Sequence, residues 1–350
     1  MHTCKVTIGS VIGLSLLMLT SSCGGGASGG GGGVGPVGPS IYLALPIPPF
    51  SSTPVSSIVQ FPSDSNGSVS PSSTVKGPTG VGFQGLAVDA TGNLYVGGLI
   101  SSDNPASQGQ LEILVYAPGS NGKAKPTRTI TGTATGLEGF TENSISGLAV
   151  DSSENVYVSS GLLKGGLVNP GISVFSSTAN GDVAPTNVIT MTGIGAFTMG
   201  QIALDSAGNI YVLATELSAP GAILIFASDS TGTVPPTSTI AGSESMLDGV
   251  EGVAVDGEGN IYVSNISSMG VPSILEFSAG STGNVAPMRT ISGSATMMSA
   301  LGNLALDSAG NIYVLNELNI LKFSPTATGN VAPIATISSA PIANFNIAVQ

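Results

Sequence analysis

Few residues of this chain can act as nucleophiles, general bases or transition-metal ligands. The 350 residues contain one histidine, His2, and two cysteines, Cys4 and Cys23, all near the N-terminus. A Ser–His–Asp or Cys–His mechanism needs a histidine beside its nucleophile, and zinc sites use mainly cysteine or histidine ligands. We therefore expect no such catalytic centre and no zinc site in the body of the chain. Carboxylate chemistry, or an oxygen-ligated ion such as Ca²⁺, remains open.

The polar residues best placed to bind a ligand are carboxylates and amides at the ends of short apolar runs. They are Asp248, Glu251, Glu317, Gln201, Asn265, Asn303, Asn316 and Asn346. Such a set can contact a polar ligand or a single Ca²⁺. The same side chains can instead satisfy backbone groups and keep the surface soluble, which is their more ordinary role. We predict no catalytic residue and no metal ligand among them, and Ca²⁺ is the one cofactor left open.

Internal repeats indicate which elements hold these residues. A box of the type G-L-A-V-D-x-x-G-N-x-Y-V occurs five times, with aspartates 51 to 62 residues apart at Asp89, Asp151, Asp205, Asp256 and Asp307. The centre of the box predicts a tight turn, because Asp accepts backbone hydrogen bonds and Gly or Asn adopts the left-handed conformation. No box has the carboxylates of an EF-hand loop. We interpret the boxes as strand–turn–strand units.

A second block alternates with the first and carries a glycine with a proline four residues later. It occurs six times, at Gly67/Pro71, Gly122/Pro126, Gly181/Pro185, Gly232/Pro236, Gly283/Pro287 and Gly329/Pro333. The missing sixth copy of the first box is divided between NIAVQ at 346–350 and IYLAL at 41–45. Each unit then has four apolar runs, and the proline precedes the outermost one, where its missing N–H does no harm.

Six units of four antiparallel strands predict an all-β fold, a six-bladed β-propeller over residues 40–350. Pairing of the N- and C-terminal strands closes the ring and removes exposed sheet edges. Small residues suit the crowded axis, and alanine recurs there at Ala87, Ala149, Ala203, Ala254, Ala305 and Ala348. Tyrosine fills the wider spaces further out, at Tyr42, Tyr95, Tyr157, Tyr211, Tyr262 and Tyr313.

The repeated boxes resemble those of NHL-repeat propellers and their bacterial surface relatives over roughly residues 41–350. Where NHL repeats often place arginine before the third strand, this chain has Ser57, Glu112, Gly171, Ala222, Ser273 and Asn319. The basic face of RNA-binding NHL proteins is absent from a chain with 8 Lys and Arg residues and a net charge of −12, so we do not carry RNA binding over.

The carboxylate and amides around Glu251 resemble the single Ca²⁺ site of gluconolactonase-type propellers, which uses Glu, Asn and Asp. No aspartate lies at the matching inner positions here. Four methionines, Met246, Met269, Met297 and Met298, fall in loops on the same rim. Thioethers suit adaptable contact surfaces, but we expect these four mainly to plug the loops.

The N-terminus is expected to direct the protein to its location. Residues 1–22 have a lysine, a short apolar stretch and small residues, as in a secretory signal peptide. Thr20, Ser21 and Ser22 before Cys23 resemble the lipobox of bacterial lipoproteins, which implies a lipid on Cys23. Residues 23–39 are rich in glycine and predict a flexible tether. The alternative is ordinary signal cleavage that leaves a stray thiol.

Three hypotheses of function follow. The first is a lipid-anchored binding or scaffold propeller of the bacterial cell envelope, on the outer membrane or cell surface, with a protein or glycan partner. The second is a Ca²⁺-dependent lactonase or related hydrolase, and the third is a purely structural surface protein. In each case we expect a monomer that contacts the membrane only through its lipid and does not bind nucleic acid.

Overall fold

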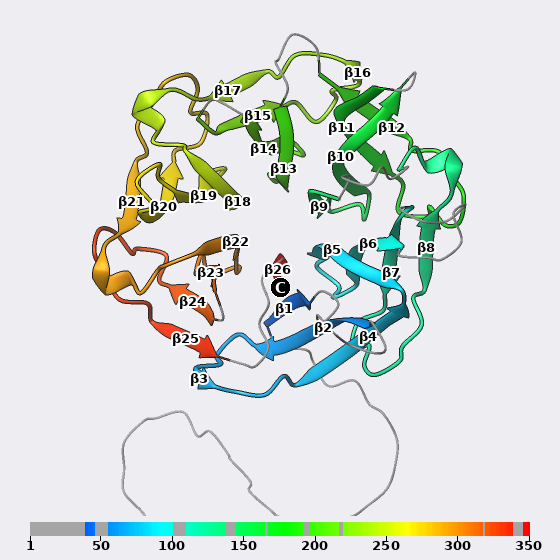
Figure 1. The fold of residues 1–350 in the computed structure, drawn as a ribbon, viewed down its shortest axis with the longest axis horizontal. Coiled ribbons are helices and arrows are strands. Elements are labelled where there is room, and N and C mark those ends of the chain that lie inside the picture. The colour runs from blue at the N-terminus through cyan, green and yellow to red at the C-terminus, as the bar shows by residue number, and fades with distance from the viewer. Residues whose placement is uncertain are drawn as a thin grey trace, which may run out of the picture. The chain divides into compact units, whose positions relative to one another are not determined.

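The structure is a computed structural model that describes residues 39–45, 55–100, 110–137, 145–164, 167–191, 197–216, 220–317, 319–338 and 346–350. The predicted signal peptide, Cys23 and the tether up to residue 38 lie outside the described residues. The described part belongs to one compact unit, Pro36–Gln350, whose strands form six sheets around an axis (Figure 1). No helix within it has the length and apolar character that a membrane span requires.

The first three blades are numbered in chain order, each from its innermost strand outwards. Blade 1 contains β26 (Asn346–Val349), β1 (Ser40–Leu45), β2 (Val55–Pro62) and β4 (Ser73–Thr79). Blade 2 contains β5 (Val81–Val88), β6 (Leu94–Ile100), β7 (Leu111–Tyr116) and β8 (Arg128–Thr131). Blade 3 contains β9 (Gly147–Val150), β10 (Val156–Lys164), β11 (Leu167–Phe175) and β12 (Asn187–Thr190).

The other three blades repeat this order. Blade 4 contains β13 (Phe197–Leu204), β14 (Ile210–Glu216), β15 (Ala222–Phe226) and β17 (Ser238–Ile240). Blade 5 contains β18 (Gly249–Val255), β19 (Ile261–Ile266), β20 (Pro272–Phe277) and β21 (Arg289–Ser292). Blade 6 contains β22 (Leu301–Leu306), β23 (Ile312–Asn316), β24 (Asn319–Phe323) and β25 (Ala335–Ser338). The predicted all-β fold, with six blades of four antiparallel strands, is confirmed.

Short elements connect neighbouring blades. The two-residue strands β3 (Gly67–Ser68) and β16 (Gly232–Thr233) pair in parallel with β25 and β12. Among the described residues three 3₁₀ helices follow outermost strands, and they are η1 (Thr133–Thr135), η2 (Ser243–Ser245) and η3 (Ser294–Thr296).

The ring closes where the two ends of the chain pair. β26 lies antiparallel to β1, with Ile347 opposite Leu43 and Ala348 opposite Tyr42. The N–H of Gln350 also donates to the carbonyl oxygen of Ser40 over 3.0 Å. The predicted division of one blade between the two termini is therefore correct. Since a closed ring has no free inner edge, each blade packs against two neighbours.

Alanine and tyrosine are directly opposed in every blade. Ala87 pairs with Tyr95 across β5 and β6, and the other five predicted alanines pair with the predicted tyrosines in the same way. In five blades the tyrosine hydroxyl donates to the aspartate of the turn, as Tyr95 does to Asp89 over 3.1 Å. Burial would raise the pKa of Asp89, but hydrogen bonds from Asn93 and Thr91 outweigh it and lower that pKa. The turn is thus tied to the core.

The glycine of each Gly/Pro pair connects one blade to the next. This glycine forms a parallel β-bridge with a residue of the outermost strand of the preceding blade, as Gly122 does with Val75. The Gly122 N–H also donates to the Thr74 carbonyl oxygen over 2.7 Å. All six glycines have φ between 61 and 78° with open space around a would-be Cβ, so the left-handed backbone is what requires glycine. Sequence analysis explained the prolines but not these glycines.

Deletion of residues 346–350 should open the ring. The loss of the buried Ile347 side chain alone costs about 2–5 kcal/mol of the free energy of unfolding, and β1 becomes a free edge. Thermal melting and size-exclusion chromatography should show a lower Tm and aggregation.

A permutant provides the matched control. It places Asn346–Val349 in front of Ile41, joined by a copy of the 89–93 turn, and should restore the Tm because the same strand returns as a covalent hairpin. A deletion variant that stays monomeric with an unchanged Tm would show that the strand pair does not hold the ring.

Candidate functional site

Amide side chains meet at the axis of the ring. Gln201 and Asn346 come from inner strands of opposite blades, β13 and β26, and the Gln201 Nε2 donates to the Asn346 Oδ1 over 2.9 Å (Figure 1 gives the strands). The Nδ2 of Asn303, in β22, donates to the same oxygen over 3.1 Å. The Nδ2 of Asn346 donates to the carbonyl oxygen of Gln84 in β5. One buried amide therefore links four of the six inner strands.

β-Bulges free these side chains from the regular pleat. The inner strands β5, β13, β18 and β22 shift register against their partners between Phe83/Gly85, Met199/Ile202, Val250/Gly252 and Leu301/Leu304. A bulge leaves a residue unpaired and redirects its side chain. Gln201, Glu251 and Asn303 all lie in these bulges, so three of the predicted site residues share one structural cause.

Glu251 is the carboxylate among these bulge residues. It is exposed, and partial desolvation raises the pKa of its carboxyl above the ordinary value. The oxygens around the axis are largely engaged: the Asn346 Oδ1 accepts two N–H groups, and the Gln84 Oε1 accepts the N–H of Ile145 over 3.1 Å. Within the residues that the structure describes, no group of three His, Cys, Asp or Glu could hold a metal ion.

Asn265 and Asn316 anchor the loops that enter blades 5 and 6. Each lies at or near the end of a second strand and is buried. The Oδ1 of Asn265 accepts the N–H of Asp248 over 2.8 Å, and the Oδ1 of Asn316 accepts the N–H of Ser299 over 2.7 Å. These two amides therefore satisfy backbone donors. Glu317, next to Asn316, is exposed with a φ of 49°.

A pocket lies beside Asp248, between blades 4 and 5. Its volume is about 380 Å³, and its walls include Met246, Met269 and Val271 as well as Asp248 and Asn265. One oxygen of Asp248 accepts the N–H of Ser268 over 3.0 Å. The structure thus splits the predicted site in two: Gln201, Asn303 and Asn346 meet at the axis, whereas Asp248 and Asn265 belong to this pocket.

Two methionines beside the 3₁₀ helices have strained backbones. Met246 and Met297 follow η2 and η3 with φ values of 59 and 61°, in the left-handed region that Gly136 occupies after η1. For a residue with a Cβ this conformation costs about 1–2 kcal/mol. The exposed fractions are 50 % for Met246, 57 % for Met297 and 87 % for Met269. The expectation that methionines plug the loops therefore fails for these three, whose side chains face solvent.

A buried carboxyl that sequence analysis did not select lies in blade 2. Glu112, in β7, is 7 % exposed, and its Oε1 has no hydrogen-bond partner in the described part of the chain. Burial raises its pKa to about 7. It faces Gly98, where a Cβ would lie 2.6 Å from Val81 and 3.4 Å from Glu112. The only sequence signal was a charged residue at a position that is apolar or small and polar in the other units.

Glu112 should make the free energy of unfolding depend on pH. Its folded pKa of about 7 exceeds the ordinary 4.5, so its folded form holds a proton that the unfolded chain has released. Stability should therefore fall as pH rises from about 4.5 through 7, by up to about 3 kcal/mol. Denaturant titrations should show this slope in the wild type and not in Glu112→Gln.

Glu258→Gln, at an exposed turn, serves as the control and should keep the wild-type slope. Equal slopes for the wild type and Glu112→Gln would contradict the shifted titration of Glu112.

Comparison with known proteins supports the fold. No family model and no curated protein sequence matches the chain. A solved structure of a protein of unknown function from Bacteroides caccae is similar with a TM-score of 0.58 and 10 % identity, over 89 % of this chain and 98 % of that one. A candidate 6-phosphogluconolactonase from Bacteroides fragilis is similar with a TM-score of 0.52 and 14 % identity, over 88 % of this chain and 83 % of that one. At such identities the likeness concerns the fold alone: the chain is a six-bladed β-propeller.

Proposed function

We propose that this chain is a lipid-anchored propeller of the bacterial cell envelope, of the NHL-repeat type, that binds a protein partner through the pocket between blades 4 and 5. The partner inserts an apolar side chain between Met246 and Met269, and the carboxylate of Asp248 at the pocket edge accepts a hydrogen bond from the partner. Methionine is suited to such contacts because its thioether is flexible and polarizable.

The backbone of Met246 is the single observation that carries this proposal. A residue in a sparsely populated conformation persists where the structure or the function requires it. Folding does not require methionine here, since Gly136 fills the equivalent position after η1 without strain. Met297 has the same backbone conformation after η3 but does not line this pocket, so the place of Met246 on the pocket wall is what distinguishes it. The Met246 side chain is exposed at the pocket wall, and its contact with the partner is the reason why methionine rather than glycine occupies this position.

Met246→Gly should separate stability from binding. Glycine relieves about 1–2 kcal/mol of left-handed strain but loses roughly 0.5–1 kcal/mol more conformational entropy on folding, so the Tm should stay the same or rise, by up to about 1 kcal/mol of unfolding free energy. Partner capture should fall, because the pocket loses one wall. Capture is measured in intact cells with a photo-crosslinking amino acid in place of Met269.

The matched control carries the crosslinker in place of Met288, which is 57 % exposed and lies outside the pocket. We expect a discrete adduct from position 269, none from position 288, and a weaker adduct from position 269 when Met246→Gly is added. Identical adduct patterns at both positions would contradict a specific pocket.

The membrane anchor is a separate part of the proposal and rests on Cys23 and the small residues before it. Cys23→Ser should move the protein from the membrane fraction to the soluble envelope fraction, because no lipid can then be attached. Fractionation and metabolic labelling with a fatty acid measure this. Ser22→Ala, which keeps a small residue beside the cysteine, should leave the anchor in place. Membrane association without Cys23 would refute it.

The Ca²⁺-dependent lactonase remains the alternative, and Glu251 is the observation that favours it. Ca²⁺ takes about six to eight oxygen ligands. Around the axis the described amide oxygens of Asn346 and Gln84 already accept N–H groups. The pocket with its strained methionine is therefore the better-supported site.

A further inference from the structure

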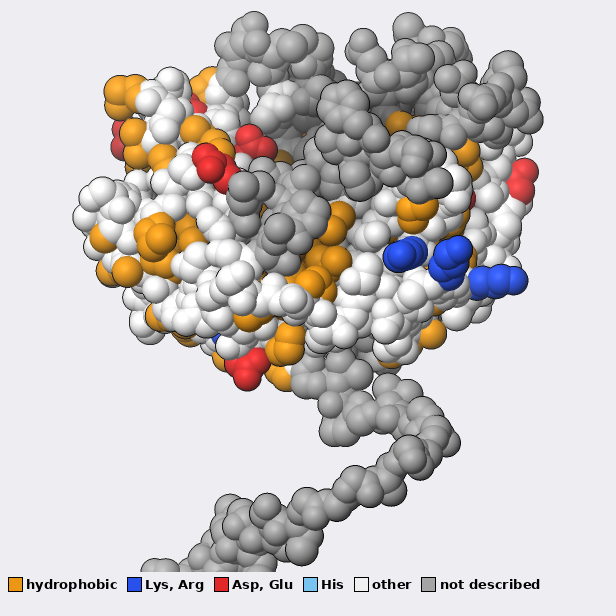
Figure 2. Space-filling model, turned by 60° about the horizontal axis from the view of Figure 1, so that its bottom comes forward, with side chains coloured by type: hydrophobic (Ala, Val, Ile, Leu, Met, Phe, Trp, Pro, Cys, Tyr) orange, Lys and Arg blue, Asp and Glu red, His pale blue; other side chains and the backbone are white. Residues whose placement is uncertain are grey.

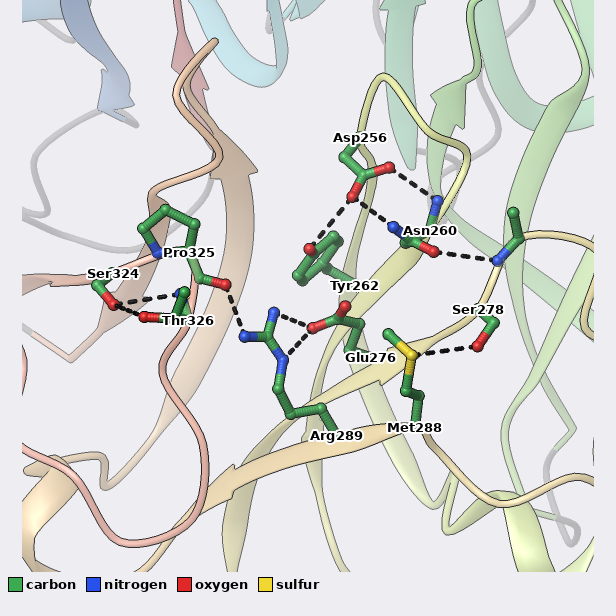
Figure 3. Close-up of polar contacts among 11 residues, drawn as sticks. Asp256, Asn260, Tyr262, Glu276, Ser278, Met288, Arg289, Ser324, Pro325 and Thr326 are labelled. Atoms are coloured by element: carbon green, nitrogen blue, oxygen red, sulfur yellow. Dashed lines mark hydrogen bonds and ion pairs between the residues drawn. The ribbon is translucent and has the colours of Figure 1, made fainter.

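Three lysines in the described part of the chain have no acidic partner, and they lie together. Three other basic side chains have partners within the ring. Arg289 pairs with Glu276 and donates to the carbonyl oxygen of Pro325, as Figure 3 shows. Lys322 lies 3.9 Å from a carboxylate oxygen of Asp307, and Arg128 donates to the carbonyl oxygen of Ala179 over 3.3 Å. Neither ion pair of the described residues includes Lys76, Lys123 or Lys125.

These three lysines line one cleft on the outer flank, between blades 1 and 2. The cleft has a volume of about 670 Å³, and its walls come from β2, β4 and the connection between β7 and β8, with Pro78 and Pro126 among them. No Asp or Glu is among the lining residues. Figure 2 shows the basic side chains of this flank side by side. The cleft is a local positive site on a chain with a net charge of −12.

The contact between blades brings the three lysines together. Lys76 follows Val75, which bridges to Gly122, and the Lys76 N–H donates to the Gly122 carbonyl oxygen over 2.7 Å. Lys123 comes directly after that glycine, and Lys125 two residues later. Lysines 47 and 49 residues apart in sequence are therefore neighbours in space.

The other junctions show that folding does not require lysine at these positions. The residues matching Lys76 are Thr131, Thr190, Ala241, Ser292 and Ser338. Those matching Lys123 are Ser68, Asp182, Thr233, Asn284 and Asn330, and those matching Lys125 are Ser70, Ala184, Pro235, Ala286 and Ala332.

At three junctions the residue matching Lys123 has a structural role. Asp182, Asn284 and Asn330 each accept an N–H at the start of a 3₁₀ helix, over 2.7 to 2.8 Å. The junction of blades 1 and 2 has no such helix, because β4 continues to Thr79 and β5 begins at Val81. At this junction the positively charged Lys123 therefore stands where three other junctions have a side chain that caps a 3₁₀ helix.

The chemistry of the cleft selects its ligand. A row of lysines attracts an anion, and their flexible stems suit a chain of repeated charges better than one rigid group. No lining residue is aromatic, so the cleft offers nucleic acid bases no surface to stack on. A concave site also makes fewer contacts with a flat bilayer than with a polymer chain that can enter it. A linear polyanion without bases fits best.

We propose that this cleft binds an acidic polysaccharide through the carboxylates of its uronic acid units. Each lysine contacts one carboxylate, and the sugar rings lie along the walls formed by Pro78 and Pro126. The site is separate from the methionine pocket and does not depend on the protein partner proposed above.

Binding of oligogalacturonate to the full chain, measured by calorimetry at several salt concentrations, tests the site. Affinity should fall steeply with salt, because three lysines release counterions from the polymer. The triple variant Lys76→Gln, Lys123→Gln, Lys125→Gln should lower affinity by about a hundredfold, roughly fivefold for each lysine. Arginine at all three positions should keep binding, and Met246→Gly should leave it unchanged.

Neutral dextran, a single-stranded oligonucleotide and vesicles of phosphatidylglycerol and phosphatidylethanolamine are the competing probes. Weak or no binding to all three, with lysine-dependent binding of oligogalacturonate, supports the proposal. Lysine-dependent binding of the oligonucleotide or the vesicles as tight as that of oligogalacturonate overturns the choice of polysaccharide. Unchanged oligogalacturonate affinity in the triple glutamine variant, or no binding at low salt, overturns the site. If that variant is unfolded by its Tm, the three single variants and the salt slope decide.

Discussion

The main-chain pairing of β26 with β1 is the constraint on which the rest of this molecule depends. A propeller blade is covered on both faces by its neighbours only if the circle is complete, and the strands that complete it here come from opposite ends of the chain. The same strand carries Asn346, whose amide links four inner strands at the axis. Closure and axial packing therefore rest on the same few residues.

Much of this architecture could be predicted from sequence because each repeated sequence unit corresponds to one blade. Alanine opposite tyrosine recurs in all six blades and the turn aspartate in five of them, so the blade count and the divided blade followed from counting. The bulges that redirect Gln201 and Glu251 could not be predicted, since a bulge depends on the register between strands. Nor could the role of Asn265, which is determined by a loop from the preceding blade.

Function is expected where one blade departs from its repeat. Met246 and Met297 both take a left-handed backbone that a glycine adopts after η1, but only Met246 of the two lines the pocket between blades 4 and 5. Three lysines replace caps and small residues at a single junction. Sequence analysis singled out the methionines but not the lysines, because Lys76 lies far from Lys123 along the chain. The NHL-repeat type, the lipid on Cys23 and the envelope location remain proposals, and none of them bears on how the ring is held.

Hydrogen–deuterium exchange of the intact protein tests the closure of the ring most directly. Amides that are exchanged only through opening of the whole structure are the slowest. If β26 and β1 close the circle, the amides of residues 41–44 and 347–349 should exchange as slowly as those of β13 and β14 in the opposite blade. Exchange of these two segments at the rate of the exposed turns, while the other blades stay protected, would contradict the account.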